Sequence, residues 1–327
     1  MGQNRLYGYL ALGKKPFSSD KIDKNFTEIL LNNVHDGIYF VDQDCRIFFW
    51  NNGAEQITGF DLSTVNGRKC SDNIISPVDE SGKNLCGEDC PVKQALSYGQ
   101  IHTIKAYLQH KEGHRLPVSI RAFPILGEDG EIIAAVETFN DISPRFLMPQ
   151  HKRELERMQL LDPLTEVGNK KFLEIHIQSR LEEIKKYRIP FGLLYIDVDH
   201  LKEVNDSYSK SVGDQILRSI AQTITNNIRF FDIVGRWDSD EFLVVVLNVD
   251  ENKLDFVGNK IRLLVEKSTI TVDSKLARVT ISVGATQALR VDSLDILITR
   301  ARSLMDHSKW LGRNKVSIKI RKEEEEL

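Results

Sequence analysis

The sequence predicts a two-domain protein, an α+β sandwich with an antiparallel sheet followed by an α/β domain with a central sheet and an edge hairpin. The chain has 327 residues, which is more than one hydrophobic core usually supports. Short apolar strands and turns follow one another over residues 26–143. From residue 162, helical and strand-like patterns alternate, which is typical of an α/β domain.

Composition and charge argue against two classes of partner. With 44 basic and 47 acidic residues the net charge is -3, so no excess of positive charge indicates binding to DNA. No apolar run approaches the roughly 20 residues that span a bilayer, and the N-terminus lacks the order of a signal peptide. We therefore expect a cytoplasmic protein without a membrane span, whose four cysteines form no disulfide framework.

The patterns of the first half are those of a small antiparallel sheet. "GIYFVDQDCRIFFWN" predicts two strands around a turn at Gln43 and Asp44, and residues 115–142 predict two longer strands around a Gly-Glu-Asp-Gly turn. Between these hairpins we expect a short helix from Val92 to Tyr98 and a strand in "IHTIKAYLQHK".

Four short motifs follow one another in this half. They are an Asp-Gly-Ile start, a Trp-Asn-Asn-Gly-Ala-Glu run, "ITGFDLSTVNGR" and the closing "VETFNDIS". In this order they resemble a PAS sensor domain over residues 26–143, preceded by an extension of residues 1–25. The resemblance implies a five-stranded sheet with flanking helices and a pocket that holds a small ligand.

The segment 144–161 differs in composition from both halves. In "QHKRELERMQLLD", Leu155, Met158 and either Leu161 or Leu160 lie at helical spacing with charges between them. The segment resembles the signalling helix that links a sensor to an output domain and often pairs as a coiled coil. The apolar repeat is shorter than several heptads, so packing against the next domain is the alternative.

An α/β pattern follows over residues 162–320, and an acidic tail of residues 321–327 ends the chain. "FGLLYIDVD" predicts a buried strand that ends in acids, and residues 213–228 place their apolar side chains on one helical face. A hairpin contains "GRWDSDEFLVVV". Two helices come next, at 252–267 and 293–311, and they are followed by the strands "ARVTISVGAT" and "KVSIKI" respectively.

Acidic side chains occur at two places that neighbouring strands would bring together. Asp197 and Asp199 alternate along one strand and so point to one side, where carboxylates and carbonyls favour a hard cation such as Mg²⁺ over zinc. The hairpin adds Asp240 and Glu241. If either cluster stood alone, an exposed acidic turn would be an equal alternative.

Two basic residues complete this set of charged side chains. Lys309 and Arg313 in "SKWLGRNK" are four residues apart and share a helical face if the helix continues, which would suit a triphosphate. Acids for a metal and bases for phosphates together predict a nucleotide site, where the cation neutralises charge during an in-line displacement.

Three segments in order, "LLYIDVDHLKEVNDSYSKSVGDQIL", "RFFDIVGRWDSDEFLVVV" and "ARSLMDHSKWLGRNKV", resemble the GGDEF domain of diguanylate cyclases. The resemblance implies condensation of two GTP into cyclic di-GMP across a homodimer, with Mg²⁺ or Mn²⁺ as cofactor and under control of the PAS domain. It implies a role for each matching residue. These residues are Asp197, the Val198 carbonyl and Asp240 for the metal, Asp240, Glu241 and Lys202 for catalysis, Asn205 and Asp214 for guanine, and Lys309 and Arg313 for the triphosphate.

Arg229 and Asp232 form an Arg-x-x-Asp pair just before the hairpin. A surface ion pair of little energy is one interpretation. The offset of the pair from the hairpin resembles that of the family's inhibitory site for cyclic di-GMP, with Lys260 or Arg262 as a further basic partner. The resemblance thus implies inhibition by the product.

The hairpin tip departs from the family pattern, which has two glycines where this chain has Asp238 and Ser239. Glycine supplies positive φ at such a tip, and a carboxylate at position 238 would lie near the triphosphate unless it faces solvent. Two hypotheses follow. An active cyclase is favoured because the matched site residues are all present, and a degenerate domain that binds cyclic di-GMP or GTP as a receptor is the alternative.

Three of the four cysteines lie in one polar segment of the first half, at Cys70, Cys86 and Cys90. They predict a thiol cluster or a site for zinc or iron. Buried small side chains and a reversible thiol pair are the alternatives. The candidates for a fourth ligand are His102, His110 and His114.

Overall fold

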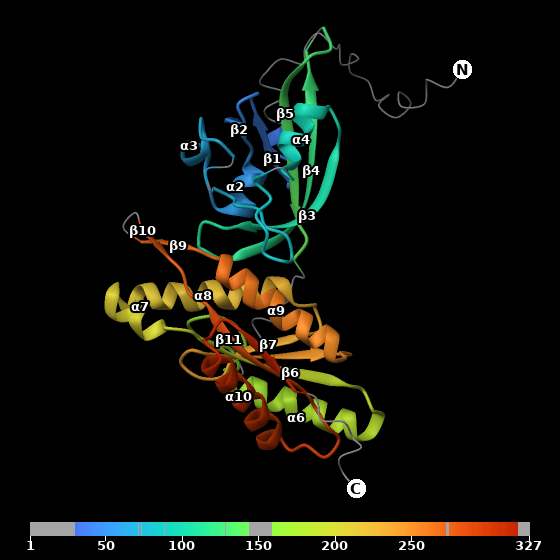
Figure 1. Ribbon diagram of the computed structural model, residues 1–327, viewed down its shortest axis with the longest axis vertical. Helices are drawn as coiled ribbons and strands as arrows, with labels where there is room; N and C mark the ends of the chain where they lie inside the picture. Colours follow the sequence, from blue (N-terminus) through green and yellow to red (C-terminus); the bar gives the residue numbers. More distant parts are fainter. Residues whose placement is uncertain are drawn as a thin grey trace, which may run out of the picture.

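A computed structural model describes residues 30–143 and 159–319, apart from residues 71, 73, 88, 128, 273 and 274. The predicted N-terminal extension, the acidic tail and residues 144–158 of the predicted linker helix lie outside the described residues. Figure 1 shows two domains that follow one another along the long axis of the molecule. Within the described residues, no helix has both the length and the apolar composition that a membrane crossing requires.

The first domain is built on one antiparallel sheet. Its elements are β1 Gly37–Val41, β2 Ile47–Trp50, α2 Asn52–Thr58, α3 Leu62–Val65, α4 Pro91–Tyr98, β3 His102–Gln109, β4 Arg115–Leu126 and β5 Ile132–Asp141. The five strands lie in the order β2-β1-β5-β4-β3, and α4 packs against β3, β4 and β5. This confirms the predicted five-stranded sheet and both predicted hairpins.

A buried carboxyl group lies in the core of the first domain. Glu137 on β5 is only 4% exposed, and the hydroxyl of Tyr39 on β1 donates a hydrogen bond to it. Burial is the largest cause that raises the pKa of Glu137 to about 8, and the nearby Cys90 thiol contributes further. The folded domain therefore holds Glu137 as a neutral acid at pH 7.

We expect Glu137→Gln to raise the melting temperature at pH 8 and to change it little at pH 5. Since the folded pKa of about 8 lies above the reference value of 4.5, the native state keeps a proton that the unfolded chain has lost. The stabilisation from this proton is complete below pH 4.5 and is lost as the pH rises towards 8. Each unit of pKa shift corresponds to about 1.4 kcal/mol, so the whole effect is a few kcal/mol.

Thermal unfolding of the two proteins between pH 5 and 8 measures this effect. The matched control is Glu55→Gln at an exposed position of α2, which should leave the pH profile unchanged. Parallel profiles for the original protein and for Glu137→Gln would contradict the prediction.

The second domain has a mixed sheet between two layers of helices. Its elements are α6 Lys170–Tyr187, β6 Phe191–Val198, α7 Leu201–Ser207, α8 Lys210–Asn227, β7 Ile233–Arg236, β8 Glu241–Leu247, α9 Glu251–Lys267, β9 Ile270–Val272, β10 Lys275–Ala277, β11 Ile281–Gln287, α10 Leu294–Trp310 and β12 Val316–Ile318. The strand order is β12-β11-β6-β8-β7, in which only β11 and β12 are parallel. The β7–β8 hairpin therefore lies at an edge, as predicted.

Alternation along the central strand divides the core of the second domain in two. Leu194 and Ile196 of β6 pack with α8 and α9, whereas Leu193 and Tyr195 pack with α6 and α10 on the opposite face. Both faces of the sheet are thus covered, which explains why its strands are continuous apolar runs. Helix α6 and the short β9–β10 hairpin have no counterpart among the predicted elements.

Helix α10 approaches strand β11 closely at Gly284. A Cβ atom at this position would lie 2.0 Å from the carbonyl oxygen of Ala301 and 2.3 Å from the main-chain nitrogen of Met305. Only glycine permits this contact between a strand and a helix backbone. The contact places the C-terminal turn of α10, which carries Lys309, beside the centre of the sheet.

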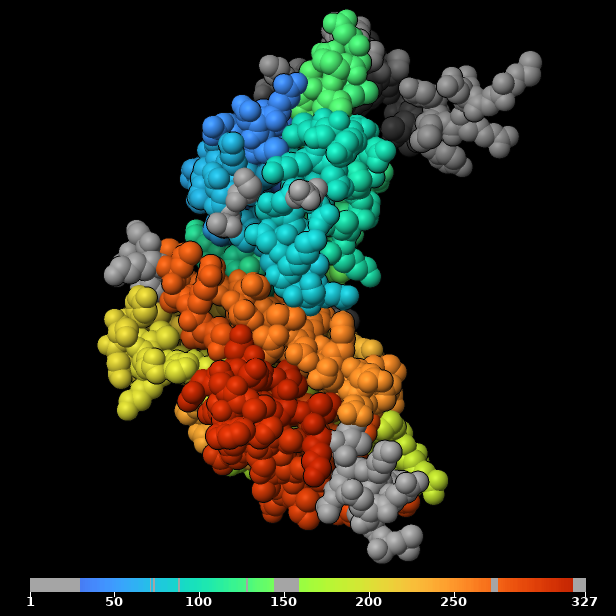
Figure 2. All heavy atoms as spheres, viewed as in Figure 1, coloured from blue at the N-terminus to red at the C-terminus, as the bar shows by residue number. Residues whose placement is uncertain are grey.

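The turn between β3 and β4 of the first domain packs against the second domain, as Figures 1 and 2 show. Arg115 at this contact is 3% exposed. Its guanidinium donates to the carbonyls of Ser76 and Tyr107 and, at 2.5 Å, to that of Lys267, the last residue of α9. The main-chain N–H of Arg115 donates to Thr223 of α8 at 3.2 Å. Burial lowers the pKa of Arg115 to about 10, and the negative end of the α9 dipole stabilises its charge.

Candidate active site

The end of β6 and the turn between β7 and β8 carry acidic side chains at one end of the sheet. β6 and β8 pair in antiparallel register with Asp197 opposite Glu241. The N–H of Val198 then donates to the carbonyl of Asp240 at 3.1 Å. The pairing places the acids of the two sequence clusters on adjacent strands.

Asp197 is buried beside a lysine. The Nζ of Lys309 lies 2.6 Å from Oδ2 of Asp197, which is 5% exposed. Burial is the largest cause that raises the pKa of Asp197 to about 6; Lys309 acts in the opposite direction, and the carboxylates of Asp240 and Glu241 raise the pKa further. Lys309 thus supplies positive charge to a cluster of three acids.

Glu241 is oriented by an aromatic hydroxyl from the neighbouring strand. Its Oε2 accepts a hydrogen bond from the hydroxyl of Tyr195 at 2.6 Å, and Arg302 lies 3.7 Å from Oε1. Burial and the contact with Glu241 raise the pKa of Tyr195, so its hydroxyl remains a neutral donor. The carboxylate of Glu241 is thereby held next to Asp197.

The tip of the hairpin does not require glycine. Asp238, Ser239 and Asp240 are all described and none of them has a positive φ. Asp238 is exposed, and its Oδ1 accepts a hydrogen bond from the N–H of Ser239 at 2.7 Å. Arg236 holds the tip by donating to the Ser239 carbonyl and by pairing with Asp162 at 3.2 Å. The expectation that the tip needs positive φ is corrected.

Asp199 serves the fold rather than the acid cluster. Its carboxylate accepts hydrogen bonds from the hydroxyls of Thr280 and Ser282, both at 2.7 Å, and from the N–H of Asn314 at 3.1 Å. Because these donors satisfy the carboxylate, Asp199 ties the end of β6 to β11 and to the segment after α10.

Helices α7 and α8 carry the two residues that were predicted to bind guanine. Asn205 packs on α8 at Gly213, where a Cβ atom would lie 1.9 Å from Oδ1 of Asn205. This oxygen is buried and has no hydrogen-bond partner. Asp214 follows Gly213 and is half-buried, while Lys202 on α7 is exposed. Asn205 therefore offers an unsatisfied acceptor beside the helix that carries Asp214.

Lys309 and Arg313 do not share a helix. Helix α10 ends at Trp310, and Arg313 lies in the following turn with φ of 62° and an exposed side chain. The common helical face, expected if the helix continued, is not formed. Arg313 is instead presented by the turn that follows α10.

Arg229 and Asp232 lie in the loop between α8 and β7. Asp232 is 1% exposed, and its carboxylate accepts hydrogen bonds from the N–H groups of Arg229 and Leu247, both at 3.0 Å. Burial raises the pKa of Asp232 despite these bonds. Lys260 donates to a carbonyl at the end of α8, and Arg262 forms an ion pair within α9. Asp232 thus shapes the loop, whereas the Arg229 side chain is exposed.

The four cysteines gather in the first domain as free thiols. Cys70 lies within hydrogen-bonding reach of both Cys45 and Cys90, which lowers the pKa of Cys45 to about 7 and that of Cys90 to about 6. Burial raises the pKa of Cys86 to about 12. Cys45 was not predicted to join this group, and metal binding by Cys70, Cys86 and Cys90 stays a prediction.

Tyr195 and Arg302, which contact Glu241, were not predicted, and neither was Arg236 at the hairpin tip. Tyr195 lies two residues before Asp197 and therefore on the same face of β6, a spacing that could have identified it. Arg236 holds the hairpin tip through a carbonyl and through a carboxylate 74 residues away in the sequence. No local pattern predicts such a contact.

Comparison with known proteins assigns a family to each domain. Residues 35–144 match the model of the PAS domain, and residues 159–315 match that of the diguanylate cyclase, GGDEF domain. The chain therefore contains a PAS domain followed by a GGDEF domain.

Several characterised proteins are similar to the chain. "Diguanylate cyclase A" of Treponema denticola is 29% identical over 319 residues, which cover 94% of this chain and 79% of that protein. "Diguanylate cyclase DosC" of Escherichia coli (strain K12) is 31% identical over 159 residues, which cover 48% of this chain but only 35% of that protein. The solved structure of diguanylate cyclase SiaD with its activator SiaC from Pseudomonas aeruginosa is 27% identical, with a TM-score of 0.49, and the match covers 52% of this chain and 67% of SiaD.

Proposed function

We propose that the protein is a diguanylate cyclase that condenses two GTP into cyclic di-GMP and pyrophosphate. The observation that carries the proposal is the acid cluster, in which Asp197 lies 2.6 Å from the ammonium group of Lys309 and close enough to Asp240 for that carboxylate to raise its pKa. Acids for a divalent cation and a base for phosphates are the groups that phosphoryl and nucleotidyl transfer require. The match to the GGDEF family and the similarity to two cyclases support the same activity.

Asp197, the Val198 carbonyl and Asp240 would hold the divalent cation, Mg²⁺ or Mn²⁺. The donor set fits, because all three ligands are oxygens, which hard divalent cations prefer, and the two carboxylates bring negative charge together. When bound, the cation neutralises charge on the triphosphate. Lys309 pairs with Asp197 in the protein alone, and we expect its ammonium group to turn to the phosphates when GTP is present.

Selection of GTP is assigned to Asn205 and Asp214. A carboxylate at Asp214 accepts hydrogen bonds from the N1 and N2 donors of guanine, which adenine does not offer in this pattern. The buried, unpartnered Oδ1 of Asn205 supplies a second acceptor. The exposed side chains of Lys202 and Arg313 would bind phosphate oxygens.

The reaction needs two copies of the domain, because each would hold one GTP. The 3′-hydroxyl of one GTP attacks the α-phosphate of the other, a new phosphodiester bond forms, and pyrophosphate leaves. A second such step in the opposite direction closes the ring. Glu241, oriented by Tyr195, is the group assigned to take the proton of the attacking hydroxyl. The proposal therefore includes a homodimer.

Control by the PAS domain is supported by the contact between the domains. Arg115 of the PAS domain touches Thr223 near the C-terminal end of α8, and Asp214 lies near the N-terminal end of the same helix. A shift of α8 would therefore move both the contact between the domains and the residue assigned to guanine binding. For product inhibition, the exposed Arg229 next to the loop shaped by Asp232 is the proposed contact for cyclic di-GMP.

Incubation of nucleotide-free protein with GTP and Mg²⁺ should yield cyclic di-GMP, and Asp240→Ala should yield none because a metal ligand is lost. Mass spectrometry of the products makes the measurement. The matched control is Asp238→Ala, two residues away, whose exposed carboxylate bonds only to the adjacent N–H in the described structure. Its rate should stay within about twofold of the original.

Product formation that persists in Asp240→Ala would contradict the role of Asp240 as a metal ligand, whereas no product from nucleotide-free dimer would contradict the cyclase. In the second case, calorimetric titration with cyclic di-GMP, with Arg229→Ala as its control, decides whether the chain acts as a receptor.

A further inference from the structure

The turn that joins β3 to β4 is held rigidly between the two domains. Its main chain is closed by hydrogen bonds from His110 to the carbonyl of His114 and from Gly113 to the carbonyl of His110, both at 2.9 Å. Gly113 has φ of 95°, and a Cβ atom there would lie 2.6 Å from Ile270 of β9. No larger residue fits at Gly113, so the turn touches the GGDEF domain with its backbone.

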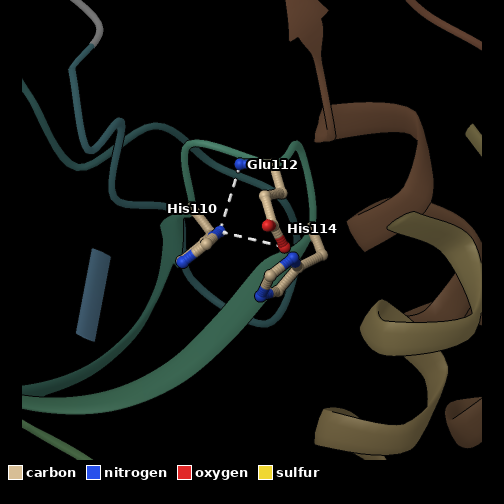
Figure 3. A group of neighbouring side chains, drawn as sticks. All are labelled: His110, Glu112 and His114. Atoms are coloured by element: carbon tan, nitrogen blue, oxygen red, sulfur yellow. Dashed lines mark hydrogen bonds and ion pairs between the residues drawn. The ribbon is translucent and has the colours of Figure 1, made fainter. Parts of the chain in front are cut away.

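Three side chains of this turn point towards one another. His110, Glu112 and His114 each offer a metal-ligating atom, and these atoms all lie within 4.8 Å of one another. The imidazole rings are stacked, with centroids 4.2 Å apart, and the carboxylate of Glu112 lies 3.9 Å from Nδ1 of His110, as Figure 3 shows. The main-chain N–H of Glu112 donates to Nδ1 of His110 at 3.1 Å, which fixes that ring.

His114 has an unsatisfied nitrogen at this position. The residue is 6% exposed, and its Nδ1 is buried without a hydrogen-bond partner. Gln222 of α8 is the hydrogen-bonding neighbour of the ring. A pair of histidines packed only for structure would be expected to satisfy both nitrogens of the buried ring. The open Nδ1 therefore indicates that a partner is missing from this cluster.

The charge state of the cluster suits a cation. Nδ1 of His114 has an unused lone pair, whereas Nδ1 of His110 accepts the N–H of Glu112 and would have to exchange that hydrogen bond for an ion. Glu112 provides negative charge, and its side chain is 67% exposed, which leaves a path from solvent. The exposed Lys111 in the same turn is the nearest opposing charge in the sequence.

We propose that His110, Glu112 and His114 form a binding site for a divalent transition-metal ion of the zinc type. Two imidazoles and one carboxylate are ligands of Zn²⁺ rather than of Mg²⁺ or Ca²⁺, which prefer oxygen. Zinc bonds of about 2.1 Å place tetrahedral donors roughly 3.4 Å apart, so the three side chains must close by rotation around the ion. A fourth position is left for water or for Gln222.

The proposed metal site lies at the contact between the two domains. Its three ligands belong to the PAS domain, while Gln222 and Ile270 across the contact belong to the GGDEF domain. Cavities of about 830 Å³ and 1250 Å³ border the turn at Lys111 and give the ion access. A bound ion would fix the turn where it meets α8.

The test uses the full-length, tag-free protein after dialysis against a chelator. Calorimetric titration with ZnCl₂ measures affinity and stoichiometry, and Co²⁺ serves as a probe of the ligands through its visible absorption. Glu112→Gln is the mild variant because the side chain is exposed, and His110→Gln removes an imidazole. His176→Gln on α6, outside the cluster, is the matched histidine control.

We expect one Zn²⁺ per chain, with affinity reduced at least about tenfold in Glu112→Gln and further in His110→Gln, and unchanged in His176→Gln. The Co²⁺ spectrum should show d–d bands without thiolate charge transfer, and a Cys86→Ser, Cys90→Ser variant should bind as well as the original. Affinity that is unchanged in both turn variants, or a thiolate band that survives His110→Gln, would assign the metal to the cysteines and overturn the proposal.

Discussion

Replacing Asp197 with asparagine should lower the rate of cyclic di-GMP formation by roughly a thousandfold, the several kcal/mol that a bound cation contributes to charge stabilisation. The protein should remain folded. Burial already raises the pKa of Asp197 to about 6, so a neutral side chain of the same shape costs little at this position. Lys309, which loses its partner, is 32% exposed and can turn to solvent.

Initial rates of product formation at saturating GTP and Mg²⁺, together with the melting temperature, make the measurement. Asp306→Asn on the exposed side of α10 is the control and should leave both quantities unchanged. A rate for Asp197→Asn within tenfold of the original would refute the assignment of Asp197 to the metal. A large loss of melting temperature would show instead that the carboxylate supports the fold.

Gly284→Ala should destabilise the GGDEF domain by about 3 kcal/mol or more, because the new methyl group overlaps the backbone of α10 at Ala301 and Met305. A helix backbone cannot give way as a flexible side chain can, so α10 must move as a unit. Activity should fall with stability, because α10 carries Lys309 into the acid cluster. Denaturant unfolding followed by circular dichroism measures the change.

Gly87→Ala is the control for this experiment, since a Cβ atom at Gly87 meets no atom within 4 Å. It should change stability by no more than about 0.5 kcal/mol. Equal stability of Gly284→Ala and the original protein would mean that α10 and β11 do not approach one another as closely as described.

The sequence predicts most of the fold because alternation and helical spacing are local. The strands at β1, β4, β5, β6 and β8 and the helices α8, α9 and α10 occur where these patterns place them. Helix α6 was not predicted, although Leu173, Ile177, Leu181 and Ile184 have helical spacing and are buried. The β9–β10 hairpin is too short for any periodic signal.

The acid cluster was predictable only in part. Asp197 and Asp240 were predicted to meet because strand ends and hairpins have few possible arrangements. The separation of Asp197 from Asp199 was not predictable, since the donors that satisfy Asp199 come from β11 and from the turn after α10. Asp238 and Ser239 are accommodated at the hairpin tip because no residue there has a positive φ, and the amino-acid sequence alone does not determine these φ values.

Because of Arg115, the sensor domain cannot be replaced by another sensor without loss of contacts to the GGDEF domain. Its guanidinium donates to the last carbonyl of α9, and its main-chain N–H donates to the hydroxyl of Thr223, so one residue of the sensor bonds to two helices of its neighbour. Grafting a different sensor in place of residues 30–143 would leave the carbonyl of Lys267 without this cation. A chimaera that keeps these contacts must therefore retain the β3–β4 hairpin that carries Arg115 together with the GGDEF domain.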